Sequence, residues 1–205
     1  MPTNNIKCRY CASTKIKSIG GLGEMPPCGF FPDEPVHTRS NVDLSLFQCT
    51  ECDLVQLMPT NIALSDQYGE NYGYRSGLNP TMVRHLKTSA AQLLASENFN
   101  KSSIILEIAA NDGTHLREFS QTGAKLIAID PAIKNWTNYY DFECLKIDKF
   151  FPCKELNHYL GKIDCIISHA CFYDLPDVKE FIAGVSSLLK DGGKWCFEQI
   201  YLPAM

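Results

Sequence analysis

Short apolar runs alternate with helix-like stretches along the second half of the chain, and this alternation constrains the fold more than any other feature. Each run has the length of a buried strand. The runs are SIILEIA, KLIAID, FECLKI, IDCIIS and KWCFEQI. Strands that alternate with helices form a parallel sheet with helices on both faces. The sequence therefore predicts an α/β fold with about five parallel strands.

A helix is expected immediately before the first of these strands. Asn79 and Pro80 supply an N-cap and a proline at the first helical position. Apolar residues then recur on one face, at helical spacing, and the helix should run to about Glu97. These residues are Val83, Leu86, Ala90, Leu93 and Leu94. Residues 61–79 precede the helix, and their tyrosines, glycines and polar side chains are typical of an ordered surface loop.

Four of the 10 cysteines form two CxxC pairs near the start of the chain. Cys8 and Cys11 make one pair, and Cys49 and Cys52 make the other. A CxxC turn aims two thiolates at one point, and four thiolates complete the tetrahedral shell that zinc prefers. Such an ion is structural, because no position is left for water. The pairs are also compatible with a redox-active dithiol or with ordinary buried thiols, and Cys28 could replace a ligand.

The remaining cysteines and most histidines carry no pattern of their own. The cysteines fall in or near the expected strands, where a thiol packs as a small apolar group. They are Cys144, Cys153, Cys165, Cys171 and Cys196. The histidines without a neighbouring pattern are expected at the surface or in the core. They are His37, His85, His115 and His158.

Residues 104–113 combine a strand with a tight turn, and the predicted helix THLREF follows. A nucleotide-binding turn needs small residues, and Ala109, Ala110 and Gly113 are small. The next strand ends in Asp130, whose carboxylate can accept both hydroxyls of a ribose. A dinucleotide fold would have GxGxxG at this turn, so its absence favours S-adenosylmethionine over NAD. The alternative is an α/β domain that binds nothing in this crevice.

The charge balance and the hydropathy exclude several classes of partner. The chain has 19 basic and 23 acidic residues, a formal charge of −4, and so has no general attraction to phosphate backbones. No stretch reaches the roughly 18 apolar residues of a membrane helix, and the N-terminus lacks the pattern of a secretion signal. We therefore expect a cytoplasmic protein with neither nucleic acid nor membrane as a partner.

Several motifs together resemble a known enzyme family over essentially the whole chain. EIAANDGTHL is similar to motif I of class I methyltransferases. The ordered series of CxxC, LGEMPP, CTECDLVQL, YGYRSGLNPTMVRHL, FYDLPD and WCFEQIYLPAM is more specific. It resembles the zinc-containing sugar C-methyltransferases, which act on nucleotide-linked keto-deoxysugars. The resemblance implies a Rossmann-like class I methyltransferase sheet preceded by a small zinc-binding module.

The resemblance also implies a cofactor site for S-adenosyl-L-methionine. The residues that would contact its methionine part are Glu107, Ala109, Asn111, Asp112 and Gly113. Asp130 with Pro131 would face the ribose, Asp148 with Phe150 would flank the adenine, and Ser168 with His169 would line the crevice. Many relatives have glycine at the position of Ala109, so a slightly altered turn is expected.

Candidate catalytic residues are fewer. Tyr72 and Tyr74 lie in the loop before the helix, and His169 ends the fourth strand. The two tyrosines are equally compatible with packing the loop on the crevice. In the family, a His-Glu-His motif that looks responsible for proton removal follows the FEQ segment, after the last residue of this chain. Whether this chain is active alone is therefore open.

The class I core has seven strands, whereas five are expected here, followed by none of the family's closing antiparallel pair. The strand around Lys194–Glu198 should then have a free edge, with Trp195 and Phe197 beside it, suited to a second copy or a complementing chain. We expect a zinc-binding module at 1–60, a Tyr/Gly-rich loop and linking helix at 61–100, and an incomplete methyltransferase core at 101–205.

Two other functions remain open at this point. One is a module that binds S-adenosylmethionine or its product without transferring a methyl group. The other is a zinc-ribbon adaptor in which the α/β part is only a scaffold.

Overall fold

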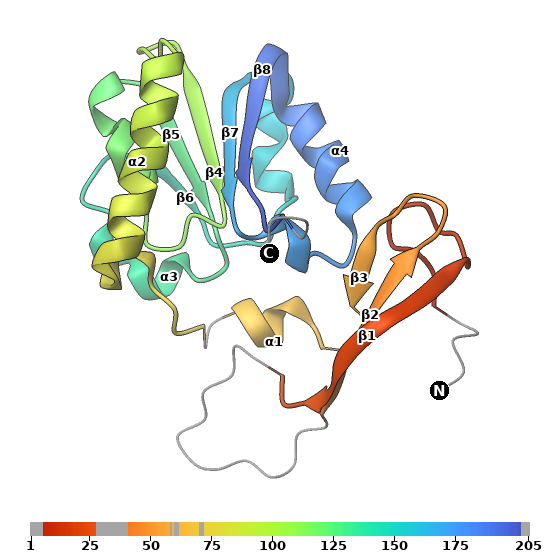
Figure 1. The fold of residues 1–205 in the computed structure, drawn as a ribbon. Coiled ribbons are helices and arrows are strands. Elements are labelled where there is room, and N and C mark those ends of the chain that lie inside the picture. Colours follow the sequence, from red (N-terminus) through yellow and green to blue (C-terminus); the bar gives the residue numbers. More distant parts are fainter. Residues whose placement is uncertain (1–5, 28–40, 58, 60–61, 70–71, 202–205) are drawn as a thin grey trace. The chain divides into compact units, whose positions relative to one another are not determined.

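The computed structural model describes residues 6–27, 41–57, 59, 62–69 and 72–201 (Figure 1). Cys28 and His37 lie outside these residues. The chain divides into two compact units. The first comprises residues 1–73 and 176–179, and the second comprises residues 74–175 and 180–205.

The first unit contains a three-stranded antiparallel sheet in the order β1-β2-β3. Its strands are β1 (Ile16–Met25), β2 (Val42–Cys49) and β3 (Val55–Leu57). Gly21 of β1 lies so close to β2 that an added Cβ would stand 2.8 Å from the Cα of Ser45. Among the described residues of this unit, few large side chains are buried, and Ile6 and Phe47 are two of them. The apolar core that these residues form is therefore small.

The second unit contains a five-stranded parallel sheet in the order β6-β5-β4-β7-β8. The strands are β4 (Ile104–Ile108), β5 (Lys125–Ile129), β6 (Leu145–Ile147), β7 (Ile163–His169) and β8 (Leu189–Glu198). This arrangement confirms the predicted α/β class and the parallel, Rossmann-like sheet. It also places β8 at one edge of the sheet, where Phe197 is 52% exposed.

Helices cover both faces of this sheet (Figure 1), and an apolar layer lies between the sheet and the helices on each face. On one face, α2 (Pro80–Ser96) and the 3-10 helix η2 (Leu116–Thr122) contribute Ala90, Leu116 and Phe119. On the other face, α4 (Val178–Leu188) contributes Phe181, Val185 and Leu188. The short elements between strands are α3 (Ile133–Trp136), η3 (Thr137–Tyr139), η4 (Lys154–Tyr159) and η5 (Phe172–Asp174).

The predicted helix after the loop is confirmed. The Asn79 side chain accepts hydrogen bonds from the backbone N–H groups of Thr81 and Met82, at 2.8 and 3.4 Å, and Pro80 occupies the first helical position. The helix ends at Ser96, one residue before the expected end. Leu86 and Ala90 are its buried residues, which confirms the apolar face.

The structure differs from two expectations about local structure. The segment 61–79 is not all loop, because it contains α1 (Leu64–Tyr68) and the 3-10 helix η1 (Ser76–Leu78). The helix expected at THLREF is present in part, as a 3-10 helix that begins only at Leu116. Thr114 gives both its backbone N–H and its hydroxyl to Asp112, so the chain turns there before the 3-10 helix begins.

In the residues that the structure covers, none of the helices has both the length and the apolar character needed to cross a membrane.

Candidate functional site

Both CxxC pairs have the same backbone geometry. In the first, Cys8 accepts a hydrogen bond at its carbonyl from the N–H of Ala12, at 2.8 Å. In the second, Cys49 accepts from Asp53 in the same way, at 2.9 Å. Ala12 and Asp53 both have left-handed backbones, with φ of 62° and 60°. Each CxxC is thus a knuckle that turns two thiols toward one side of the chain.

The two knuckles bring four sulfur atoms together. The Sγ atoms of Cys8 and Cys52 are 3.6 Å apart, and those of Cys11 and Cys49 are 3.5 Å apart. Such separations are far longer than a disulfide bond of about 2.05 Å. Four sulfurs at about 2.3 Å from one zinc ion would lie roughly 3.8 Å from one another. All four Sγ atoms lie within 4.8 Å of one another, so this donor set fits zinc.

Local hydrogen bonds favour the thiolate form of Cys8 in the first knuckle. Burial favours the neutral thiol of Cys8, but the backbone N–H groups of Cys11 and Tyr10 hold its pKa down at about 7. Buried Gln56 on β3 ties this knuckle to the sheet, accepting from the N–H of Arg9 and donating to the carbonyl of Lys7, both at 3.0 Å. The thiolate form of Cys8 is therefore accessible near neutral pH. In the same knuckle the N–H of Ser13 lowers the pKa of Cys11, but burial and the neighbouring thiols of Cys49 and Cys8 raise it overall.

The carboxyl ends of four parallel strands meet along one edge of the larger sheet. In its register, Ile108 pairs with Ile129 on one side and with Ser168 on the other. Ile129 pairs in turn with Ile147. The residues that follow these strands therefore lie along a single edge of the sheet. They include Ala109, Asp130, Asp148 and His169, and most of the predicted cofactor residues lie at or just after these strand ends. Ligands of open α/β sheets bind at this kind of edge.

The turn after β4 has an unusual backbone. Ala109, Asn111 and Gly113 have φ of 59°, 50° and 74°. Glycine adopts this left-handed region freely and asparagine tolerates it, whereas alanine is strained there. At Gly113 an added Cβ would stand 2.7 Å from the ring of Tyr140, whose hydroxyl donates to the carbonyl of Asn111 at 2.9 Å. Position 113 therefore requires glycine, both because its backbone is left-handed and because Tyr140 leaves no room for a Cβ atom.

Asp130 fixes the same turn from the neighbouring strand. Its Oδ2 accepts from the N–H of Asn111 at 3.0 Å, and its Oδ1 accepts from the N–H of Ala132 at 2.7 Å. Asp130 is buried, and this burial raises the pKa of its carboxyl group. Each carboxylate oxygen still has a lone pair for another donor.

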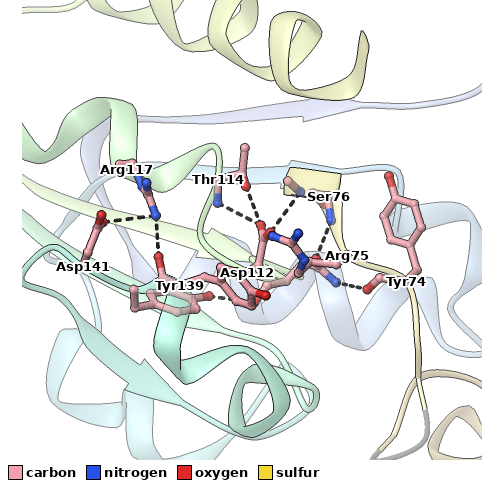
Figure 2. Close-up of polar contacts among 11 residues, drawn as sticks. Tyr74, Arg75, Ser76, Asp112, Thr114, Arg117, Tyr139 and Asp141 are labelled. Atoms are coloured by element: carbon pink, nitrogen blue, oxygen red, sulfur yellow. Dashed lines mark hydrogen bonds and ion pairs between the residues drawn. The ribbon is translucent and has the colours of Figure 1, made fainter. Parts of the chain in front are cut away.

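A second set of contacts joins the turn to the segment before α2 (Figure 2). Asp112 accepts from the N–H of Gly77 at 2.9 Å and from the guanidinium of Arg75 at 3.3 Å. Asn111 accepts from the N–H of Ser76 at 2.9 Å and donates to the carbonyl of Tyr74 at 3.0 Å. The Asp112 side chain is 1% exposed, so its charge depends on these donors.

Arg75 also connects the turn to the segment after α3. Its guanidinium carbon lies 4.1 Å from the centre of the Tyr139 ring, within the range of a cation–π contact. The Tyr139 carbonyl accepts from Arg117, which also lies 3.1 Å from Asp141 (Figure 2). The turn after β4 is thus held by residues 74–77, and Arg75 connects it to the segment that contains Tyr139.

Glu107 lies next to two histidines. Its Oε1 is 3.2 Å from Nδ1 of His115 and 3.7 Å from Nδ1 of His169. Burial opposes ionisation of Glu107, but the two histidines outweigh it and lower the pKa of its carboxyl group. A pocket of about 580 Å³ between α2 and the ends of β7 and β8 is lined in part by His169, Ser89 and Glu198.

The other predicted site residues have varied surroundings. Asp148 and Phe150 are exposed after β6, and Pro131 is half-buried after β5. Ser168 is buried and accepts from the indole N–H of Trp195 at 2.9 Å. The Tyr74 side chain is exposed, while Tyr72 belongs to the first unit and packs edge-on against Tyr68, with ring centres 5.3 Å apart.

Sequence reasoning did not find two parts of the site. It treated His115 as an isolated histidine, although a polar Glu107 inside an apolar strand indicates that a partner must lie nearby. It also assigned no role to Arg75, Ser76 and Gly77, because nothing in their own segment shows that they dock on a turn more than 30 residues later.

Comparison with known proteins finds one family model for each end of the chain. A family model described as "Putative zinc binding domain" matches residues 8–61. A model described as "Methyltransferase domain" matches residues 82–203, more than half of the chain. The chain belongs to this methyltransferase family.

The most informative relatives of this methyltransferase chain are distant. C-methyltransferase NovU from Streptomyces niveus is 22% identical over 201 residues, which cover 96% of this chain and 47% of NovU. The chain therefore spans about half the length of this curated relative.

Solved structures give partial alignments. The YcgJ protein from Bacillus subtilis is 16% identical, with a TM-score of 0.47, and the match covers 54% of this chain and 49% of YcgJ. The 1,6-didemethyltoxoflavin-N1-methyltransferase from Burkholderia thailandensis, solved with S-adenosylhomocysteine, is also 16% identical, with a TM-score of 0.43, and covers 55% of this chain and 50% of its own. The strand order described above establishes the fold without them.

We expect Cys49→Ser to release zinc from the methyltransferase chain and to loosen the first unit, because serine is a poor zinc ligand and the apolar core there is small. Metal analysis of the purified protein and hydrogen exchange in residues 6–57 would measure both effects. The matched control is Cys144→Ser, outside the cluster, which should keep its zinc. Full zinc retention by Cys49→Ser would contradict the prediction.

We expect Asp112→Asn to lower the free energy of unfolding of the second unit by roughly 2–3 kcal/mol, because an amide cannot accept all the donors that this buried carboxylate satisfies. Both tryptophans, Trp136 and Trp195, lie in this unit, so their fluorescence in urea reports on it. Amide exchange at Gly77 should accelerate as well. The exposed Asp141, changed in the same way, should have little effect on either measurement.

We expect Ala109→Gly to raise the free energy of unfolding by about 0.5–1 kcal/mol, because glycine removes the strain of a left-handed alanine at some cost in chain entropy. The same tryptophan-monitored urea unfolding would detect it. Ala124→Gly, at a position without a positive φ, should destabilise instead. A loss of stability in Ala109→Gly would show that the strain is not present in solution.

Proposed function

We propose that this protein is an S-adenosylmethionine-dependent methyltransferase that methylates a carbon atom of a nucleotide-linked keto-deoxysugar. The proposal depends on one observation, the arrangement of residues at one edge of the sheet. Asp130 follows β5, Asp148 follows the neighbouring β6, and the strained turn 109–113 follows β4 on the other side of β5. Membership of the methyltransferase family supports the reaction class.

The residues along this edge fit the cofactor by their chemistry. The ribose of S-adenosylmethionine carries two hydroxyl donors, and Asp130 has a remaining lone pair on each oxygen. The exposed Phe150 offers an apolar face to an adenine, and the exposed Asp148 offers an acceptor to its amino group. The cofactor, when bound, supplies an activated methyl group on a sulfonium.

Two findings support a carbon atom as the methyl acceptor. NovU is described as a C-methyltransferase, and the motif series resembles enzymes that methylate nucleotide-linked keto-deoxysugars. A carbon beside a ketone must first lose a proton to a base, while a donor stabilises the enolate oxygen. Tyr72, Tyr74 and His169 are our candidate catalytic residues in this chain. With S-adenosylmethionine bound, its methyl group would pass from the sulfonium sulfur to that carbon.

The four-cysteine cluster has a structural role in this proposal. Four sulfur ligands fill the coordination shell of zinc and leave no position for substrate or water. The ion stabilises a unit that has little apolar core of its own. In this view Cys8, Cys11, Cys49 and Cys52 contribute to folding and not to methyl transfer.

Calorimetric titration of the zinc-loaded chain with S-adenosylhomocysteine tests the cofactor site. We expect saturable binding that Asp130→Asn weakens by about 10-fold or more, the effect of losing a hydrogen bond to a charged group. Asp191→Asn, a change of the same kind at an exposed position, should bind normally. Absence of binding in a folded, zinc-loaded chain would contradict the cofactor assignment. Methyl transfer to a nucleotide-linked ketosugar, assayed with the whole protein, tests the acceptor separately.

A further inference from the structure

We propose that Glu107, His115 and His169 form a binding site for a divalent first-row transition-metal ion, separate from the four-cysteine cluster. The proposal rests on the geometry, the burial and the unsatisfied polar atoms of these three side chains. It does not depend on which acceptor the protein methylates.

The three residues come from different elements but share one region of the second unit. Glu107 lies on β4, His169 ends the neighbouring strand β7, and His115 lies directly before η2. Their side chains are 4%, 14% and 1% exposed, respectively. A carboxylate and two imidazoles are thus collected in a space from which water is largely excluded.

The distances suit a shared metal ion. Glu107 Oε1 lies 3.2 Å from Nδ1 of His115 and 3.7 Å from Nδ1 of His169. Two ligand atoms at about 2.0–2.1 Å from one ion, at a tetrahedral angle, lie roughly 3.4 Å apart. The observed values fall on either side of this separation. One donor atom from each of the three residues lies within 4.8 Å of the others, so a small contraction completes the site.

Unsatisfied polar atoms are the second, independent observation. Within the part of the chain that the structure describes, neither ring nitrogen of buried His115 has a hydrogen-bond partner. The same holds for Oε2 of Glu107 and Nδ1 of His169. Leaving a buried polar group without a partner costs about 1–3 kcal/mol. A bound cation would satisfy the carboxylate and both Nδ1 atoms at once.

His169 is already oriented for this role. Its Nε2 lies 3.1 Å from the hydroxyl of Ser89, and Nδ1 faces Glu107. Histidines that bind metals usually engage their other ring nitrogen in such a hydrogen bond, which fixes the ring. Since His169 also lines the pocket beside α2, the ion would lie one side chain away from that pocket.

The donor set defines the class of ion. Two imidazole nitrogens and one carboxylate oxygen suit zinc, iron, cobalt or nickel as divalent ions, whereas magnesium and calcium prefer oxygen ligands alone. A protonated histidine paired with Glu107 is the competing arrangement. It uses the same three residues and predicts that no ion binds.

Cobalt titration distinguishes the two arrangements. The full 205-residue chain is first loaded with zinc at the cysteine cluster and then titrated with Co²⁺, followed by calorimetry and visible absorption. We expect one further equivalent to bind, without the charge-transfer absorption that thiolate ligands produce. Bound cobalt should also raise the melting temperature, because it binds only the folded chain.

Two variants locate the ion, and a third serves as the control. His169→Asn and His115→Phe should each weaken cobalt binding by about 10-fold or more, as expected for loss of one of three ligands. His158→Asn removes an exposed imidazole elsewhere and should bind as the unchanged chain does. If His115→Phe does not fold, His169→Asn, with its less buried side chain, decides the result.

Two results would overturn the proposal. One is a folded, zinc-loaded chain that takes up no cobalt. The other is uptake that persists unchanged in His169→Asn, which would assign the ion to a different group of side chains.

Discussion

The pairing of β4 with a parallel strand on each side is the constraint on which the rest of the second unit depends. Because Ile108 pairs with both Ile129 and Ser168, three strands end at the same level. Their ends place Ala109, Asp130 and His169 side by side. The turn after β4, the acid after β5 and the histidine cluster all result from this common level.

Three buried acids around the turn after β4 are stabilised in three different ways. Asp112 is satisfied by backbone N–H groups, a hydroxyl and Arg75. Asp130 is satisfied by two backbone N–H groups. Glu107 has only two imidazoles at a distance, and Oε2 has no donor among the described residues. A buried charge is costly without partners. An additional cation would therefore stabilise Glu107 more than it would stabilise Asp112 or Asp130.

The two units achieve stability by different means. The second unit encloses a parallel sheet between two apolar layers, which burial alone can stabilise. Few large side chains are buried among the residues of the first unit that the structure describes, and these residues include the group of four sulfurs between two matched knuckles. Its left-handed residues, Ala12 and Asp53, are determined by the turn that each knuckle requires. Metal and backbone hydrogen bonds there take the place of a larger core.

Features with a local cause could be predicted from the sequence. The capping of α2 by Asn79 depends on neighbours two and three residues away. The apolar runs specify buried strands, and the spacing within each CxxC pair specifies a knuckle. The common edge of the sheet also follows from the alternation of strands and helices. One local contact was missed: Asp112 accepts from both the backbone N–H and the hydroxyl of Thr114, so the helix begins only at Leu116 and is a 3-10 helix.

The sequence by itself determined the strands, the helix before them and the four cysteines, because periodicity, capping and CxxC spacing act over a few residues. Only the tertiary structure decided that Gly77 binds Asp112 and that His115 faces Glu107. The first contact joins residues 35 positions apart, and the second spans the whole turn after β4. Their geometry depends on how the chain packs on β4, and no short stretch of sequence carries that information.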